Sequence, residues 1–244
     1  MGNGAREYEG GKRFGSGTGA RPDACHVLVA WSGGKDSALA LHEVLAGGAH
    51  GVAALLTTVT EDYDRVSMHG VRRVLLERQA AALGLPLEQV LIPKDASNGV
   101  YETNMAHALA AYRRAGVQAV VFGDIFLEDL RTYREEKLAP VGMRGIFPLW
   151  KRRTSELARS FISLGFKAVT TCVDTTMLGA EFVGRIIDER FLADLPASVD
   201  PCGEHGEYHS FVFDGPIFKE AVRFRVGEKV LRDERWYYCD LAPA

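Results

Sequence analysis

The sequence has no long hydrophobic run and little surplus charge of either sign. None of its apolar runs reaches the roughly 20 residues that a membrane-spanning helix needs. The N-terminal residues do not contain the apolar segment of a secretory signal. The formal net charge is −3 at pH 7, which gives no electrostatic reason to bind nucleic acid or a membrane surface. These absences predict a soluble, cytoplasmic protein with no membrane partner, and they disfavour nucleic acid as a partner.

Cysteines are also few, and none of them forms a C-x-x-C motif. They are widely separated, at Cys25, Cys172, Cys202 and Cys239. This spacing predicts reduced thiols and excludes a disulfide framework of the kind that stabilises small secreted proteins. The sequence shows no internal repeat, and 244 residues are enough for one large domain with a smaller appendage.

Three regions differ in composition. Residues 1–24 are rich in glycine and polar residues and predict a flexible leader. In residues 25–150, apolar strand-like runs alternate with helix-like runs, which predicts an α/β fold with an open parallel sheet and helices on both faces. Residues 151–244 end in short strand-like segments separated by glycine and charged turns, and they predict a small C-terminal α+β appendage.

Local signals set the bounds of three elements within this pattern. We expect Asn98 to cap a helix that runs to Ala115. Residues 145–150 predict a fifth short strand, and residues 184–192 predict a helix in the C-terminal region.

The densest functional signal is a loop between a predicted strand and a predicted helix. The apolar run 26–31 leads into the loop, and strong helix formers follow it. Glycines let backbone N–H groups converge, and the N-terminus of a helix favours negative charge. The loop therefore predicts a binding site for a phosphate chain, and its residues are Ser32, Gly33, Gly34, Lys35, Asp36 and Ser37. The alternative is a tight turn with a capping serine and an exposed lysine.

This loop lacks the spacing of a Walker motif and the third glycine of a dinucleotide fingerprint. It resembles the S-G-G-x-D-S PP-loop of the N-type ATP pyrophosphatases. These enzymes cleave ATP between the α and β phosphates and adenylate a carbonyl-type oxygen. The resemblance implies ATP as cofactor, together with Mg²⁺ at Asp36, which would offset the charge of the triphosphate.

Other candidate residues follow the fourth predicted strand. Because the loops that follow parallel strands share one edge of the sheet, we expect Gly123 and Asp124 to border the nucleotide. Arg131 and Arg134 on the next helix have two interpretations. They reach the phosphates, or they lie on a solvated helix face and pair with acidic neighbours. His69, in the loop after the second predicted strand, is interpreted as a polar loop residue.

A second polar loop lies near the C-terminus, over residues 200–210. Its glycines exclude a stable helix, so the segment presents its side chains from a loop. Three interpretations remain open. The loop recognises a substrate and carries out acid–base chemistry, it binds a metal ion through Cys202, His205 and His209, or it is a polar surface loop.

The run D-P-C-G-E-H-G-E-Y-H-S-F-V-F-D-G-P-I-F, residues 200–218, resembles the signature of the diphthine–ammonia ligase (diphthamide synthetase) family. The family pattern is G-E-N-G-E-[FY]-H-[TS], and His205 stands where asparagine is usual. Residues 68–71, 123–125 and 148–150 (M-H-G-V, G-D-I and P-L-W) fit as well, so the resemblance covers about residues 26–218.

The resemblance implies ATP-dependent amidation. An acceptor carboxylate is adenylated, and ammonia then displaces AMP after pyrophosphate has left. Glu204, Glu207 and His209 match the acceptor-side signature and are the predicted catalytic residues. The acceptor is a carboxylate on a small molecule or on a modified protein side chain, and a homodimer is compatible with the sequence. The alternative from another class is a sensor that binds ATP or AMP without turnover.

The phosphate-loop interpretation predicts that Gly34→Val abolishes ATP binding and leaves the fold intact. A side chain at this position would occupy the space where phosphate oxygens approach the backbone. Calorimetry with the folded variant measures the effect, and an unchanged ATP affinity would contradict the interpretation.

Overall fold

The computed structural model describes residues 25–66, 70–94 and 96–244. The predicted leader and the loop residues Ser67–His69 lie outside the described residues. No helix within the described ranges is long and apolar enough to cross a bilayer.

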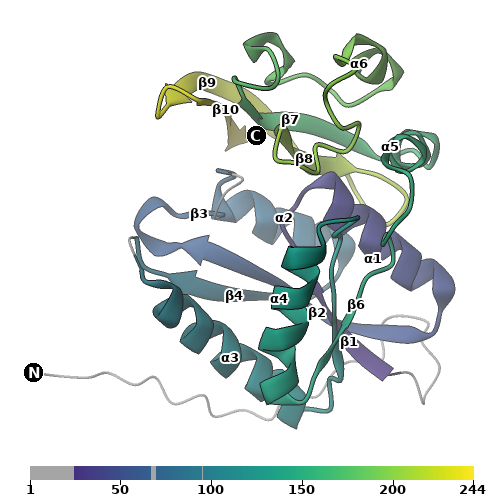
Figure 1. Cartoon of the computed structure of the whole chain (residues 1–244), viewed down its shortest axis with the longest axis vertical. Coiled ribbons are helices and arrows are strands. Elements are labelled where there is room, and N and C mark those ends of the chain that lie inside the picture. The colour runs from purple at the N-terminus through teal and green to yellow at the C-terminus, as the bar shows by residue number, and fades with distance from the viewer. Residues whose placement is uncertain (1–24, 67–69, 95) are drawn as a thin grey trace, which may run out of the picture.

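The first sheet is mostly parallel and reverses its strand order at β1 (Figure 1). Neighbouring strands in it are β4, β2, β1, β5 and β6, in that order, all parallel. Their bounds are β1 Cys25–Ala30, β2 His50–Thr60, β4 Leu87–Ile92, β5 Ala119–Val121 and β6 Arg144–Ile146. A short antiparallel strand, β3 (Arg65–Val66), pairs with the end of β2. Ligands of such sheets bind at the carboxyl ends of the strands where the order reverses, here between β1 and β5.

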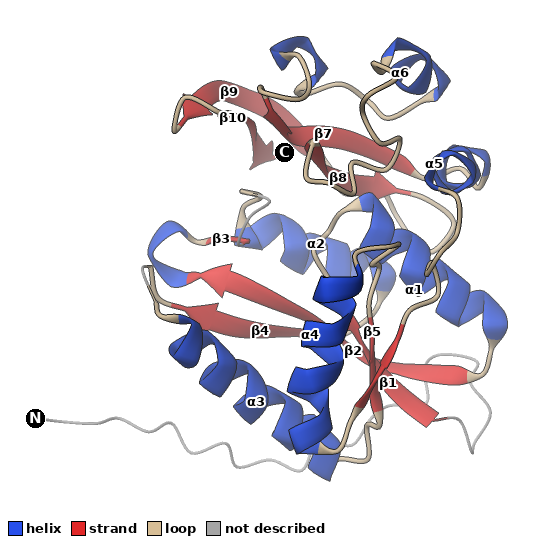
Figure 2. Ribbon diagram, in the orientation of Figure 1, coloured by secondary structure: helices blue, strands red, loops and turns tan. Residues whose placement is uncertain are grey.

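Helices cover both faces of this sheet (Figure 2). Side chains of α1 (Lys35–Gly47) and α2 (Arg73–Leu83) share a core cluster with Val27 and Val29 of β1. On the opposite face, α3 (Asn98–Arg114) and α4 (Glu128–Leu138) contribute to a cluster around Leu28. Burial on both faces explains why β1 reads as a continuous apolar run. The predicted parallel sheet with two helical layers is confirmed.

The C-terminal region forms a second, antiparallel sheet with strand order β8–β7–β10–β9. Its strands are β7 Lys167–Asp174, β8 Tyr208–Asp214, β9 Phe224–Arg232 and β10 Trp236–Pro243, and its helices are α5 Thr154–Ser163 and α6 Glu189–Asp194. This sheet packs against the layer of α1 and α2, where β8 contacts α1 and β10 contacts α2. The apolar core is therefore continuous from the first sheet through this helical layer into the second sheet. The α+β appendage is confirmed.

Three local predictions were wrong. Ser97, and not Asn98, is the N-cap of α3, and the helix ends at Arg114. Strand β6 ends at Ile146, because residues 148–151 form a turn that places Leu149 in the core.

The helix predicted for residues 184–192 begins only at Glu189. The preceding residues make a turn at Gly184, whose φ is +79°, and pair with β7, where the Gly184 N–H donates to Thr170 O at 2.8 Å and the Ile187 N–H donates to Ala168 O at 2.9 Å. Pairing with a strand edge takes precedence here over local helix propensity.

A buried side-chain amide on α2 connects three segments that are distant in sequence. Gln79 is fully buried and accepts a hydrogen bond from the Trp31 indole N–H at 2.9 Å. Its amide nitrogen donates to Gly33 O at 3.0 Å and to Val212 O at 2.6 Å. Gly33 O also accepts from the Val212 N–H at 2.9 Å. One side chain thus joins the end of β1, the loop at residues 32–37 and strand β8.

Gln79→Leu should lower the free energy of unfolding by about 3 kcal/mol, because the buried Trp31 indole loses its acceptor and Val212 O loses this donor. Urea unfolding measures the loss. The matched control is Gln118→Leu at an exposed glutamine, which should change stability by less than about 0.5 kcal/mol. Equal effects of the two substitutions would contradict a central role for the Gln79 amide.

Candidate functional site

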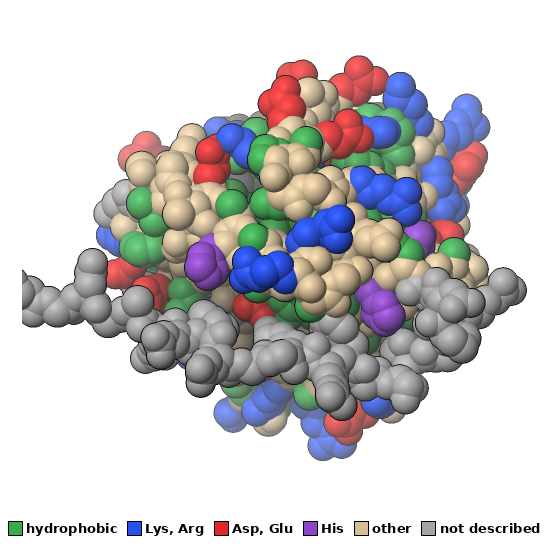
Figure 3. All heavy atoms as spheres, turned by 90° about the horizontal axis from the view of Figure 1, so that it is seen from below, with side chains coloured by type: hydrophobic (Ala, Val, Ile, Leu, Met, Phe, Trp, Pro, Cys, Tyr) green, Lys and Arg blue, Asp and Glu red, His purple; other side chains and the backbone are tan. Residues whose placement is uncertain are grey.

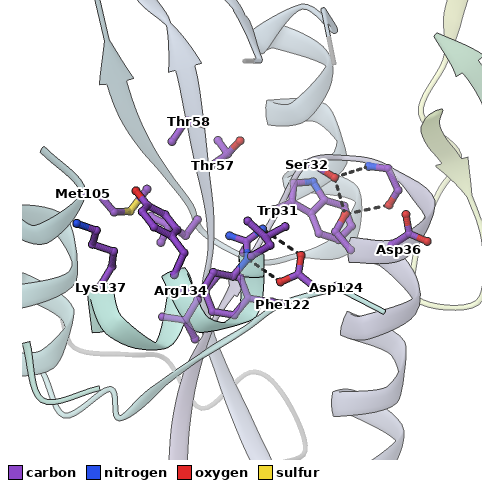
Figure 4. A pocket seen from close by; sticks show the side chains of 18 of the residues that line it. Trp31, Ser32, Asp36, Thr57, Thr58, Met105, Phe122, Asp124, Arg134 and Lys137 are labelled. Carbon is purple, nitrogen blue, oxygen red and sulfur yellow. Dashed lines mark hydrogen bonds and ion pairs between the residues drawn. The ribbon is translucent and has the colours of Figure 1, made fainter. Parts of the chain in front are cut away.

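A pocket of about 650 Å³ lies at the carboxyl edge of the first sheet (Figure 4). Its wall is formed by residues 32 and 34–37 of the loop after β1, the end of β2, helices α3 and α4, Gly123 and Asp124, and residues from 203 to 210. The volume is typical of a site for a small ligand. The pocket brings together the two loops that the sequence singled out.

Hydrogen bonds within the loop at residues 32–37 hold it in a closed turn. Ser32 Oγ accepts from the Gly34 N–H at 3.2 Å and lies 3.3 Å from Ser37 Oγ, which donates to Gly34 O at 2.9 Å. Gly33 has a φ of +78°, and a Cβ there would lie 2.7 Å from the Gln79 side-chain oxygen. Glycine is therefore required at position 33 both by conformation and by space. The loop leads directly into α1, whose N-terminus points at the pocket.

Lys35 is not the exposed lysine of the alternative interpretation. The Lys35 side chain is only 6% exposed, and its ammonium lies 2.8 Å from Asp36 Oδ2. The ammonium also donates to Cys202 O. Burial alone would lower the pKa of Lys35, but Asp36 and other neighbours raise it above its ordinary value. Burial raises the pKa of Asp36 in turn, and Lys35 offsets only part of that effect.

Gly123 allows the end of β5 to touch the start of α1. A Cβ at position 123 would lie 2.7 Å from the carbonyl carbon of Asp36 and 3.0 Å from the Ser37 nitrogen. Both contacts are with backbone, which cannot move aside without shifting the loop. The first sheet thus places residues 123 and 124 beside the loop at 32–37, where the sequence placed them.

Asp124 and Arg134 form an ion pair on the pocket wall, drawn with dashed lines in Figure 4. Their shortest N–O distance is 2.6 Å, and the guanidinium lies 4.4 Å from the ring centroid of Phe122. Arg131 does not line the pocket. It pairs with Glu135 at 2.9 Å on the helix surface, as the second interpretation of the arginines predicted.

The loop at residues 200–210 contacts the segment between β5 and α4 through Glu204. One carboxylate oxygen of Glu204 accepts from the Ile125 N–H at 2.8 Å and from the Phe126 N–H at 3.3 Å. Burial is the main reason why the pKa of Glu204 is raised, and the two backbone hydrogen bonds partly offset it. Glu204 lines the pocket, so its carboxylate is placed to meet a ligand.

Glu207 has a different environment. It is fully buried and does not line the pocket. One oxygen accepts from the Asp200 N–H at 2.9 Å and the other accepts from the His205 N–H at 2.9 Å. These contacts make Glu207 a brace within its own loop, whereas its predicted catalytic role stays a prediction.

His209 lies on β8 and lines the pocket, with its ring stacked on Trp236 at a centroid distance of 6.5 Å. Burial, with a smaller effect from the charge of Lys35, lowers the pKa of His209 to about 4. The imidazole is therefore neutral at pH 7.

The described residues contain no group of three or more His, Cys, Asp or Glu arranged to hold a metal ion. They therefore do not support the metal interpretation of Cys202, His205 and His209. A magnesium ion needs fewer protein ligands, because one or two carboxylates hold it together with the phosphates of the bound nucleotide. The Asp36 carboxylate lies on the pocket wall and its side chain is 31% exposed, so it can meet such a cation there.

Two contributors were missed by sequence reasoning. Gln79 supports the loop from an otherwise ordinary helix, and Ser210 accepts from the Lys35 backbone N–H at 3.1 Å. Gln79 stands in no recognisable motif, whereas Ser210 is the last position of the G-E-N-G-E-[FY]-H-[TS] pattern but had no role assigned to it. The alternation of strands and helices predicts α2 but not which of its side chains would meet the loop.

Figure 3 shows how charged side chains are distributed on one face of the molecule. Basic and acidic side chains both lie on this face, with neutral ones between them. This mixed face gives no support for a nucleic-acid partner, because the phosphate backbone of a nucleic acid binds to a continuous basic surface.

The fold and the site define an α/β protein of the PP-loop class, with the phosphate loop between β1 and α1. Two family models match the chain. Residues 25–145 match the diphthamide synthase N-terminal domain, and residues 153–242 match the diphthamide synthase C-terminal domain. The chain belongs to the diphthamide synthase family.

Several relatives of this chain are named diphthine–ammonia ligase. The human protein is 26% identical over 227 residues, covering 84% of this chain and 85% of its own. The bovine protein is 25% identical over 218 residues, covering 80% of this chain and 81% of its own. The fission yeast protein is 26% identical over 215 residues, which are 80% of this chain but only 35% of that longer protein.

The depressed pKa of His209 predicts an acid-sensitive fold. Unfolding restores the pKa of His209 to its ordinary value of 6.5. Between about pH 6.5 and 4, the unfolded chain therefore binds a proton at this residue that the folded chain does not bind. Stability should therefore fall as the pH is lowered from about 6.5 to 4. NMR titration of the ring measures the pKa, and urea unfolding at both ends of this range measures the slope.

His209→Gln should reduce that slope, and His107→Gln at an exposed position on α3 should leave it unchanged. A His209 ring that titrates near 6.5 would contradict the burial argument.

Proposed function

We propose that this protein is an ATP-dependent ligase that adenylates an acceptor carboxylate and amidates it with ammonia. The observation that supports it best is the shared pocket, in which the phosphate loop at 32–37 faces Glu204 and His209. The names of the relatives supply the reaction class, and diphthine is the acceptor that those names state. A homodimer and a cytoplasmic location stay predictions.

The pocket suits ATP because its two ends differ in chemistry. The end at residues 32–37 offers hydroxyls, glycine backbone and the N-terminus of α1, and would take the triphosphate. The end between α3 and α4 is apolar, with Met105, Leu109 and Phe122 on its walls, and would take the nucleoside. Figure 4 shows Met105 and Lys137 on one side of the pocket and Ser32 and Asp36 on the other.

In the first step, a carboxylate oxygen of the acceptor attacks the α-phosphorus of ATP, and pyrophosphate leaves. In the second step, ammonia attacks the acyl carbon, AMP leaves, and the nitrogen loses its extra proton. No covalent enzyme intermediate is needed, so orientation and charge neutralisation supply most of the acceleration. Magnesium held at Asp36 would neutralise charge on the phosphates.

The residues of the chain divide this work. Backbone groups and hydroxyls of residues 32–37 hold the phosphates in place. The Glu204 carboxylate lies at the opposite wall, where it would hydrogen-bond ammonium or orient ammonia. His209 is neutral at pH 7 and is the side chain suited to take the proton that the nitrogen loses.

The second candidate is a sensor that binds ATP or AMP without turnover. A sensor needs the phosphate loop and an apolar nucleoside pocket, but it does not need a buried carboxylate and a neutral imidazole on the facing wall. The presence of Glu204 and His209 in the same pocket favours the ligase.

The nucleotide product tests the reaction class. With ATP, Mg²⁺, ammonium and a diphthine-containing acceptor, AMP and pyrophosphate should appear in proportion to the amide. Chromatography of the nucleotides and mass spectrometry of the acceptor measure both. ADP and orthophosphate in that proportion would show acyl-phosphate chemistry instead. A protein that binds ATP but forms neither product pair with any acceptor would be the sensor.

Glu204→Gln tests the acceptor side. Glutamine keeps an oxygen that accepts from the Ile125 N–H but removes the charge. We expect ATP affinity within about threefold of wild type and amide formation reduced by on the order of a hundredfold. Glu228→Gln, at an exposed position on β9, is the matched control and should change neither quantity. Loss of ATP binding in Glu204→Gln would assign this carboxylate to the nucleotide instead.

A further inference from the structure

The loop at residues 200–210 is a preformed unit braced by its own side chains. Glu207 accepts from the backbone at residues 200 and 205, each at 2.9 Å. Asp200 Oδ1 accepts from the Cys202 N–H at 2.8 Å, and the Tyr208 hydroxyl donates to Pro201 O at 2.6 Å. A loop braced in this way keeps its shape, so its contacts with other segments decide where it sits.

Two charged side chains make contacts between this loop and other segments. Glu204 accepts from the backbone N–H groups of Ile125 and Phe126, in the segment between β5 and α4. Lys35, from the start of α1, donates to Cys202 O. The Cys202 thiol also lies 3.3 Å from Thr154 O, but a thiol is a weak donor. Two polar ties therefore join the loop to the phosphate-binding end of the pocket, namely the contact of the Lys35 ammonium with Cys202 O and the hydrogen bond from the Lys35 backbone N–H to Ser210 Oγ at 3.1 Å. The ammonium contact is the one that a substitution of the Lys35 side chain removes.

The Lys35 ammonium has three N–H donors, and three groups surround it. They are Asp36 Oδ2 at 2.8 Å, Cys202 O, and the face of the Tyr208 ring at 5.1 Å from its centroid. The first belongs to α1 and the other two belong to the loop or to the strand that follows it. A phosphate could gain the ammonium only by displacing one of these partners, at the cost of a buried contact.

Local charge explains why a lysine is needed here. Burial and the surrounding carboxylates raise the pKa of the Cys202 thiol, whereas the Lys35 charge acts to lower it. The carboxylates that act on this thiol are Asp36, Asp200 and Glu204. Lys35 thus places a positive charge beside this acidic group, and an uncharged residue would leave the Asp36 carboxylate, whose side chain is 31% exposed, without its ion-pair partner.

We propose that Lys35 is a positioning residue, which holds the 200–210 loop against the phosphate loop and so sets Glu204 and His209 relative to the nucleotide. This role differs from the direct phosphate contact predicted from the sequence. This proposal deepens the proposed function, and it rests on that function for the identity of the substrate on which the loop acts. The loop position itself is measurable without nucleotide or turnover.

Cys202 reports the loop position, because its thiol is 2% exposed when the loop is docked. The experiment is iodoacetamide labelling of the full chain in the absence of nucleotide, with mass spectrometry to resolve each cysteine. Cys172 is fully buried within β7 and reports global unfolding. In Lys35→Met, labelling of Cys202 should rise at least tenfold over wild type, and labelling of Cys172 should stay unchanged.

Two further variants keep the test decisive. Lys35→Met/Asp36→Asn removes both charges, so no carboxylate is left without its ion-pair partner, and Cys202 should still become reactive. Lys229→Met is the matched control, because its ammonium also donates to a backbone carbonyl, Val183 O at 2.7 Å, but on another part of the second sheet. It should leave Cys202 unreactive.

The proposal is overturned if Cys202 in the double variant labels as slowly as in wild type, or if Cys172 labels in parallel with it. It is also overturned if Lys35→Met loses ATP affinity by calorimetry and keeps Cys202 protected, because Lys35 would then be a phosphate ligand. A protein that makes no AMP but passes the labelling test would refute the proposed function and leave the loop assignment standing.

Discussion

The Gln79 amide and the carbonyl oxygen of Gly33 form the contact on which the site depends. Gln79 takes one hydrogen bond from Trp31 and gives one each to Gly33 O and Val212 O. Both donors of the amide and its acceptor are thus used in a fully buried position, where an unmade hydrogen bond is costly. The contact ties α2, the phosphate loop and the second sheet into one unit.

This tie explains how residues about 170 positions apart come to share a pocket. The phosphate loop belongs to the first sheet, whereas Ser210 and His209 belong to β8 of the second. The Val212 N–H donates to Gly33 O, and the Lys35 N–H donates to Ser210 Oγ, so β8 is bonded directly to the loop. The continuous apolar core between the two sheets prevents one sheet from sliding over the other.

The pocket combines two kinds of rigidity. On the nucleotide side, glycines at 33 and 123 permit backbone contacts that a Cβ would prevent. On the facing side, a loop with its own braces is held by Lys35 and Glu204. Under the proposed function, catalysis by orientation requires that reacting groups are held with little freedom, and these two walls would meet that requirement without any covalent link between them.

The sequence by itself determined the layers of the fold, the position of the phosphate loop and the family. These depend on local patterns, namely buried strand runs, helix formers and a glycine loop, and parallel sheets place the loops that follow their strands at one edge. Tertiary structure decided the rest. Lys35 reads as a phosphate ligand in its motif, yet Cys202 O and Tyr208 reach its ammonium only because β8 packs beside α1. The sequence presents Glu204 and Glu207 as equivalent carboxylates. In the structure, Glu207 accepts from the backbone of its own loop, whereas Glu204 accepts from the backbone of another segment. The roles of such side chains depend on burial and on partners from distant segments, and local sequence spacing contains no information about either.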